Sequence, residues 1–145
     1  MHCIKRILDA TDFSKQSENA LDWAKCVADA FGAKLVLLHV IDVFSLSETG
    51  ALMTGMDPLC MIREQATRNF DQLKTTFPDA EMLIREASPR PCIVEAAVEL
   101  NCDLVVMGTH GRSGLAHLLL GSVAEYVVRH SKVPVMTVRT PTRKA

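Results

Sequence analysis

Short apolar runs alternate with longer segments of helical periodicity along almost the whole chain. Apolar and β-branched runs predict five strands, at Cys3–Leu8, Lys34–Ile41, Glu81–Glu86, Asp103–Met107 and Val133–Arg139. Apolar residues at helical spacing predict four helices between them, beginning near Ser14 or Ser17, at Asp57-Pro58, at Ser88-Pro89 and at Gly121-Ser122. Strands that alternate with helices form a parallel sheet covered on both faces, so the pattern predicts an α/β fold.

Residues 42–57 break this rhythm. The segment contains Ser, Thr, Gly and Met residues without a clear period. A connection of this length in a compact domain is often a functional lid or a mobile segment, and the sequence leaves both interpretations open. The helical pattern resumes at Asp57, which can cap a helix, and Pro58, which suits a first helical turn.

The composition is that of an ordinary globular protein. A length of 145 residues suits a single domain spanning residues 1–145. With 48% hydrophobic and 23% charged residues, the chain is neither disordered nor a small disulfide scaffold. The net charge of −1 argues against a dedicated nucleic-acid binder or a polybasic membrane binder. The longest apolar run, Leu35–Ile41, is far shorter than the roughly 20 residues that span a bilayer.

Five cysteines are scattered along the chain, and no two have Cys-x-x-Cys spacing. The odd number and the scatter predict reduced thiols in a cytoplasmic protein, each buried as a small hydrophobic residue. A metal cluster of Cys102, His110 and His117 fits no standard zinc pattern, so no metal site is expected.

A glycine-rich segment follows the fourth predicted strand. It lies in a basic quarter of the chain, residues 108–145, which holds six Lys and Arg against one Glu. Gly108 and Gly111 allow a positive φ and a close backbone approach, so main-chain N–H groups can face an anion. Gly121-Ser122 begins a helix, whose first N–H groups and dipole favour phosphate. Arg112 adds a charged donor.

The start of that last helix has a second explanation. Ser122 and Glu125 match the capping box Ser-x-x-Glu, which accounts for both residues without a ligand. Glycines after a strand are also ordinary turn formers. Spacing alone therefore leaves open both a phosphate ligand and a purely structural role.

The Gly-x2-Gly-x9-Gly-Ser pattern at Gly108, Gly111, Gly121 and Ser122 resembles the nucleotide-binding signature of the universal stress protein family. Segments 7–14, 37–40, 105–114, 118–125 and 133–139 resemble the same family, in the right order along nearly the whole chain. The resemblance implies an open five-stranded parallel sheet in the order 3-2-1-4-5 with helices on both faces. This is a Rossmann-like fold of the adenine nucleotide alpha hydrolase type.

Carried over by position, the resemblance implies a nucleotide site between the first and fourth strands. Val40 would contact adenine, Asp12 would be a polar partner of the nucleoside, and the start of the last helix would hold the phosphates. The implied site residues are Ala10, Thr11, Asp12, Val40, Met107, Gly108, His110, Gly111, Arg112, Gly114, Gly121, Ser122, Val123 and Ala124. The chain departs from the family pattern at Asp9, where an apolar residue or proline is commoner, and at Ala87, where glycine is usual.

The resemblance also implies a function. Members with the full glycine pattern bind ATP, so the chain is expected to bind ATP, or ADP or AMP, with Mg²⁺ held mainly by the phosphates and no catalytic residue assigned. It would be a small cytoplasmic stress-response module that regulates through a protein partner the sequence does not identify. A homodimer would form by antiparallel pairing of the last strands, Val133–Arg139, because an apolar edge strand invites pairing.

Two other functions remain open. No Gly-x4-Gly-Lys-Ser/Thr loop is present, which argues against an efficient kinase or nucleotidase. Slow ATP hydrolysis is still compatible with the sequence, because a bound triphosphate with Mg²⁺ can turn over without a dedicated base. A dimeric interaction scaffold that does not use nucleotide is the other alternative.

Overall fold

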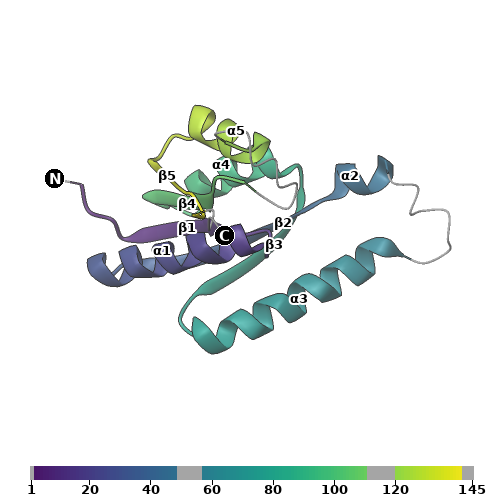
Figure 1. The fold of residues 1–145 in the computed structure, drawn as a ribbon, viewed down its shortest axis with the longest axis horizontal. Coiled ribbons are helices and arrows are strands. Elements are labelled where there is room, and N and C mark those ends of the chain that lie inside the picture. Colours follow the sequence, from purple (N-terminus) through teal and green to yellow (C-terminus); the bar gives the residue numbers. More distant parts are fainter. Residues whose placement is uncertain (1, 49–56, 111–119, 142–145) are drawn as a thin grey trace.

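Five parallel strands form one sheet at the centre of the protein (Figure 1). The computed structural model describes residues 2–48, 57–110 and 120–141. In spatial order, the strands are β3 (Glu81–Ala87), β2 (Lys34–Asp42), β1 (Arg6–Ala10), β4 (Leu104–Gly108) and β5 (Val135–Val138). The predicted α/β fold and its strand order 3-2-1-4-5 are therefore confirmed.

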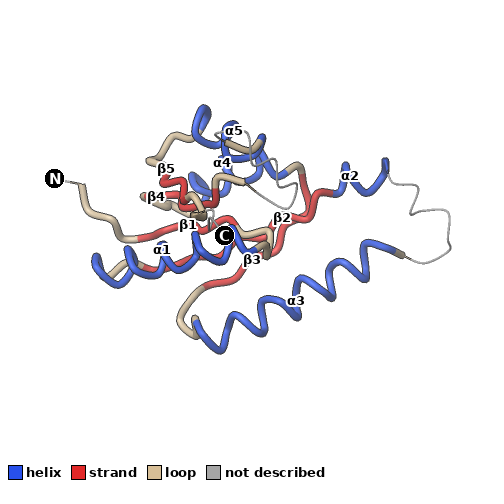
Figure 2. The backbone as a smooth tube through the Cα atoms, viewed as in Figure 1, coloured by secondary structure: helices blue, strands red, loops and turns tan. Residues whose placement is uncertain are grey.

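Helices cover both faces of the sheet, as predicted. They are α1 (Lys15–Phe31), α2 (Val43–Glu48), α3 (Pro58–Thr76), α4 (Pro89–Glu99) and α5 (Ser122–His130). The tube in Figure 2 shows α1 and α3 on one side of the sheet and α4 and α5 on the other. Phe70 and Phe77 join the hydrophobic cluster on the first side, and Ile93 and Val127 join the cluster on the second. Of the described helices, none is both long and apolar enough to cross a bilayer.

Three helix ends lie at residues that the sequence predicts: both ends of α1 and the start of α3. The Ser14 side chain accepts a hydrogen bond from the N–H of Ser17 and caps α1, and Gly32 ends that helix with a left-handed φ of 64°. Asp57 caps α3 by accepting from two N–H groups of its first turn, and Pro58 occupies that turn. Each of these signals is local: a capping side chain, a left-handed glycine or a first-turn proline marks a helix end without a tertiary contact.

A short helix occupies part of the segment that lacks a period. Helix α2 begins after Asp42, whose carboxylate accepts hydrogen bonds from the N–H groups of Phe44 and Ser45 at 3.2 Å each. The Ser45 hydroxyl donates to the same carboxylate at 2.7 Å. Six residues are too few to show helical periodicity, so the sequence missed this helix. The remainder of the segment, residues 49–56, lies outside the described residues, and so does any test of the lid.

The first and last strands differ from their predicted bounds. Instead of Cys3–Leu8, β1 begins at residue 6, because the Asp103 carboxylate accepts the N–H groups of Lys5 and Arg6 at 2.8 and 3.0 Å. Instead of Val133–Arg139, β5 keeps only the residues that pair with β4. A side-chain carboxylate therefore sets the start of β1 and pairing with β4 sets the bounds of β5, and in neither strand does the apolar run decide.

The expectation that all five cysteines are buried is wrong for three of them. All five thiols are free, but Cys3, Cys26 and Cys60 are exposed, whereas only Cys92 and Cys102 are buried. Burial raises the pKa of both buried thiols, which keeps them protonated. The three exposed thiols lie on the N-terminal segment and on the outer sides of α1 and α3, so they contribute nothing to the core.

One carboxyl side chain, that of Asp9, lies buried in the described part of the core. Along β1, Ile7 faces the cluster beneath α1 and Leu8 faces the opposite cluster, so strand alternation puts Asp9 on the side of Ile7. Asp9 is fully buried and is paired in the sheet with Leu37 and Val106, and neither carboxylate oxygen has a hydrogen-bond partner. Desolvation raises its pKa well above the ordinary 3.8.

Candidate functional site

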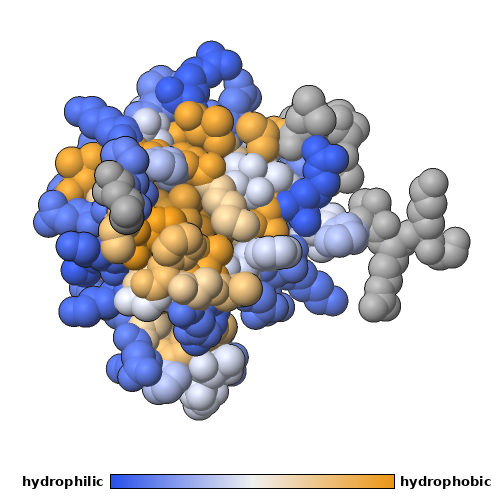
Figure 3. Space-filling model, turned by 90° about the vertical axis from the view of Figure 1, so that its left-hand side faces the viewer, coloured by the Kyte–Doolittle hydropathy of each residue, from blue (hydrophilic) through white to orange (hydrophobic). Residues whose placement is uncertain are grey.

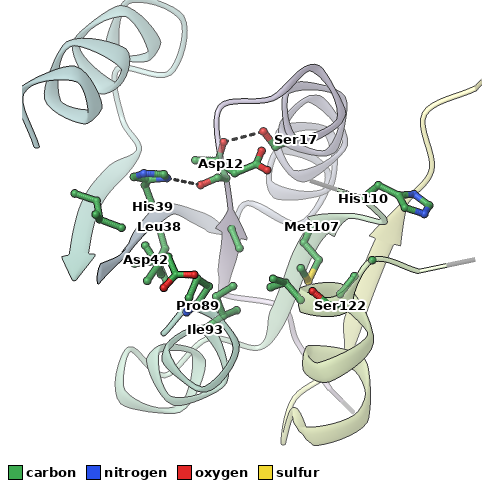
Figure 4. Close-up of a pocket in the computed structure, with 18 of the residues that line it drawn as sticks. Asp12, Ser17, Leu38, His39, Asp42, Pro89, Ile93, Met107, His110 and Ser122 are labelled. Atoms are coloured by element: carbon green, nitrogen blue, oxygen red, sulfur yellow. Dashed lines mark hydrogen bonds between the residues drawn. The ribbon is translucent and has the colours of Figure 1, made fainter. Parts of the chain in front are cut away.

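A cavity of about 590 Å³ opens at the carboxyl ends of β1, β2 and β4 (Figure 4). This is the edge where open parallel sheets bind ligands, at the point where the strand order reverses. One wall comes from the loop after β1, another from β2 and α2, and a third from the end of β4 and the start of α5. Ile62 of α3 and Ile93 of α4 close the apolar sides.

The loop after β1 is held by its own hydrogen bonds. The Thr11 N–H donates to the Leu38 carbonyl at 2.9 Å, which extends the pairing of β1 with β2 by one residue. The Thr11 hydroxyl accepts the N–H of Phe13 at 3.0 Å and donates to the Ser17 hydroxyl at 3.1 Å. The Asp12 carboxylate accepts the N–H of Ser14 at 3.0 Å. The loop therefore presents Asp12 at the cavity in a defined orientation.

His39 of β2 also forms a hydrogen bond with the loop after β1. Its Nδ1 lies 2.8 Å from the Thr11 carbonyl oxygen, and Figure 4 draws this bond. Because a carbonyl can only accept, Nδ1 carries the proton and donates it. The His39 ring packs against the Phe13 ring with centroids 4.5 Å apart. The sequence contained one signal for this role, a histidine that interrupts the apolar run of the strand.

Within the part of the chain that the structure describes, no side chain caps the start of α5. Gly121 is the N-cap residue, its N–H donates to the Thr109 carbonyl at 2.6 Å, and Ser122 is already the first helical residue. Glu125 forms an ion pair with Arg129 at 3.1 Å and does not reach back to the helix start. The capping box that the sequence left open is therefore not formed. The first residues of α5 line the cavity, and no side chain among the described residues takes up their N–H groups.

Gly108 lies where α1 approaches the end of β4. It is not among the described residues with a positive φ. A Cβ at this position would lie 3.2 Å from the Gln16 carbonyl oxygen of α1. The glycine thus lets α1 pack closely against the end of β4, which brings the loop after β1 next to the start of α5.

A second cavity of about 500 Å³ adjoins the first. The two share Asp42, Ser45, Pro89, Ser122 and Val123. The second is also lined by the start of α4, including the exposed Arg90. The starts of α4 and α5 therefore meet beside the first cavity. A charged part of a ligand that extends beyond the first cavity would enter the second, next to Arg90.

Comparison with known proteins identifies the family. The sequence matches the model of the universal stress protein family over residues 4–139. The chain belongs to the universal stress protein family. Universal stress protein MJ0577 of Methanocaldococcus jannaschii is 29% identical over 93% of this chain and 94% of its own length. MJ0531 of the same organism is 33% identical over 97% of this chain and 85% of its own.

Solved structures of universal stress proteins share the fold. The structure of MJ0577 superimposes with a TM-score of 0.85 at 30% identity and covers 97% of this chain and 99% of its own. A universal stress protein crystallised in complex with cAMP gives a TM-score of 0.69 at 30% identity and covers 97% of this chain and 100% of its own.

The cavity of this universal stress protein gathers most of the residues expected from the family resemblance. Eleven of the fourteen line it: Ala10, Thr11, Asp12, Val40, Met107, Gly108, His110, Gly121, Ser122, Val123 and Ala124. Gly111, Arg112 and Gly114 lie outside the described residues. Sequence reasoning missed eleven further lining residues: Ser17, Leu38, His39, Ile41, Asp42, Ser45, Leu46, Ile62, Pro89, Ile93 and Thr109. Four of these lie in the second half of β2 and six in the first two turns of helices, so that only the assembled sheet reveals that they meet at one cavity.

Proposed function

We propose that this universal stress protein binds an adenine nucleotide in the cavity at the ends of β1, β2 and β4, and serves as a cytoplasmic regulatory module. The observation that carries the proposal is a cavity that joins apolar walls to a helix start that no described side chain caps. Apolar walls suit a purine ring, and a helix start suits phosphate. The relative crystallised with cAMP, 30% identical over 97% of this chain, supports the same ligand class.

The lining residues suggest how the ligand lies. Adenine would occupy the apolar part, between Val40 of β2 and Met107 of β4. The Asp12 carboxylate would accept from the ribose hydroxyls. The N–H groups at the start of α5 would donate to phosphate oxygens, completed by Gly111, Arg112 and Gly114 as the family pattern implies. ATP is the expected nucleotide, with Mg²⁺ held by its phosphates, and ADP and AMP are the alternatives.

Nucleotide released from freshly purified protein, identified by mass spectrometry, tests the proposal first. Titration calorimetry with ATP, ADP, AMP and cAMP then ranks the ligands, and we expect a Kd on the order of micromolar or tighter for at least one. Absence of adenine nucleotide, together with no heat and no thermal shift for all four ligands, would sink the proposal.

A substitution at the helix start makes the test site-specific. Gly121→Val puts two methyl groups where phosphate would approach the backbone, so binding should be lost. Ala30→Val adds two methyl groups on the exposed face of α1, and this variant should bind the nucleotide like the wild type. Equal affinity in both variants would place the ligand elsewhere.

We also propose that the protein forms a homodimer through β5. This strand lies at one edge of the sheet and pairs with β4 alone among the described strands. Figure 3 shows apolar side chains gathered on the side of the molecule that lies at the left of Figure 1. The carbonyls of Pro134 and Val138 accept bonds from β4, so the alternate residues Val135 and Thr137 turn their backbone groups to the open edge. A second copy of β5 would pair with these groups.

Proline substitutions separate this edge from the fold. Thr137→Pro removes an N–H that faces outward, so it should give a folded monomer in sedimentation experiments. Met136→Pro removes an N–H that faces β4, so it should destabilise the sheet itself. A Thr137→Pro protein that remains a dimer would show that another surface forms the interface.

A further inference from the structure

Phe13 adopts a backbone conformation that its side chain disfavours. Its φ is 62°, in the left-handed region, and among the described residues other than glycine only Asn101 shares a positive φ. Asparagine tolerates this region, whereas a bulky aromatic residue rarely adopts it. Such strain persists only where the surroundings enforce it, and it is concentrated at functional sites.

Two aromatic rings hold Phe13 in place. Its ring lies 4.5 Å from the His39 ring of β2 and 5.2 Å from the Phe70 ring of α3, the latter edge to face. Phe70 is almost fully buried in the cluster beneath α1 and α3. The side chain of Phe13 thus anchors the loop to a strand on one side and to a helix on the other.

The residues before Phe13 face the cavity, although Phe13 and Phe70 do not line it. Thr11 and Asp12 precede Phe13 directly, and His39 both packs on the Phe13 ring and donates to the Thr11 carbonyl. A change in the φ of Phe13 would turn the peptide that follows Asp12 and break the bond from the Ser14 N–H to the Asp12 carboxylate. The aromatic contacts therefore control where that carboxylate points.

We propose that Phe13 is a positioning residue for ligand binding: the clamp of His39 and Phe70 on its ring holds the loop in the strained form that presents Asp12 to the ligand. The inference rests on the proposed nucleotide site. It assigns binding energy to two residues outside the cavity, one of which, Phe70, belongs to α3. The packing of α3 then contributes to ligand affinity.

The test compares ring and backbone at position 13, with MgATP and AMP as probes in titration calorimetry. Phe13→Gly permits a positive φ without strain but removes the ring, and we expect at least a tenfold weaker affinity. Phe13→Tyr keeps the ring and should restore affinity to within about twofold of the wild type. If the ring served only the fold, both variants would bind like the wild type, and the glycine would change only the stability.

Phe70→Leu tests the same clamp from α3 and keeps the loop sequence intact. It should weaken binding severalfold, and adding it to Phe13→Gly should cost little more, because both remove one contact. Asn101→Ala is the matched control, since it perturbs the other left-handed residue, which precedes β4 at the amino ends of the strands, away from the cavity. It should lower thermal stability and leave affinity within twofold.

The outcomes are distinct. Wild-type affinity in both Phe13→Gly and Phe70→Leu, with folded protein confirmed by circular dichroism, overturns the positioning role and leaves the nucleotide site intact. A wild-type protein that binds none of the nucleotides overturns the proposed function and this inference together.

Discussion

Replacing the buried carboxyl of Asp9 should make the stability of the protein less dependent on pH. Asp9 is fully buried, its oxygens have no hydrogen-bond partner, and desolvation is the cause of its raised pKa. Asp9→Leu replaces both oxygens with methyl groups, while Asp9→Asn keeps the shape and the polarity without the titration. Asp9→Asn isolates the effect of the titrating proton on stability, and Asp9→Leu adds the effect of removing a buried polar group.

The magnitude has two parts. Burying a neutral polar group without a hydrogen bond costs about 1–3 kcal/mol in proteins at any pH. In addition, the folded state keeps the proton that the unfolded chain loses above its ordinary pKa of 3.8. This second cost grows by about 1.4 kcal/mol for each pH unit until the folded-state pKa is reached. Leucine is larger than aspartate, so overpacking of about 1–3 kcal/mol offsets the first part but not the pH slope.

The sign follows from the linkage of protons to folding. A carboxyl whose folded pKa is raised gives its full stability below the unfolded pKa, and that stability is lost as pH rises through the folded pKa. Wild-type protein should therefore lose stability relative to Asp9→Leu and Asp9→Asn as pH increases from 4 upward. Urea unfolding of all three proteins at pH 4, 5, 6, 7 and 8 measures the difference. Parallel pH profiles for the wild type and both variants would refute the reasoning, because they would show that Asp9 is ionised and compensated in the fold.

Two further substitutions test local features of the fold. Asp57→Ala removes the carboxylate that caps α3 and should cost about 1 kcal/mol, which for a protein of this size lowers the Tm by roughly 3 °C; Asp57→Asn should retain most of the cap. Gly108→Ala places a Cβ 3.2 Å from the Gln16 carbonyl oxygen, so it should destabilise by about 1 kcal/mol in urea unfolding; an unchanged midpoint would mean that α1 shifts freely.

The sequence predicted those parts of the fold whose signals are local. Alternating apolar runs predicted the parallel sheet, and Ser14, Gly32 and the Asp57-Pro58 pair marked three helix ends correctly. The strand order came from the family resemblance, because periodicity says nothing about which strand lies beside which. The sequence did not predict helix α2, because its six residues begin at one capping carboxylate and carry no hydrophobic stripe.

The candidate site shows the same limit. The residues after β1 and β4 could be expected, since glycines and polar residues there break an apolar pattern. Ile62 could not, because at helical spacing it looks like a core residue, yet it lines the cavity. Gly108 was expected from its place after β4, but the room that its missing Cβ leaves for the backbone of α1 could not be. Such roles depend on which element packs opposite a residue, and a single sequence does not contain that information.

Asp9 and Asp12 lie three residues apart in one segment, and their surroundings give them opposite roles. Strand alternation turns Asp9 away from the cavity and into the cluster beneath α1, where it is held by neighbours on both sides. Regular pairing of β1 ends at Ala10, and the Thr11 N–H makes the last bond to β2, so Asp12 leaves the sheet at the cavity. The left-handed turn at Phe13 then reverses the chain into α1. One carboxyl is thereby expected to lower stability as pH rises, while the other lies at the cavity, where the proposed ligand would meet it.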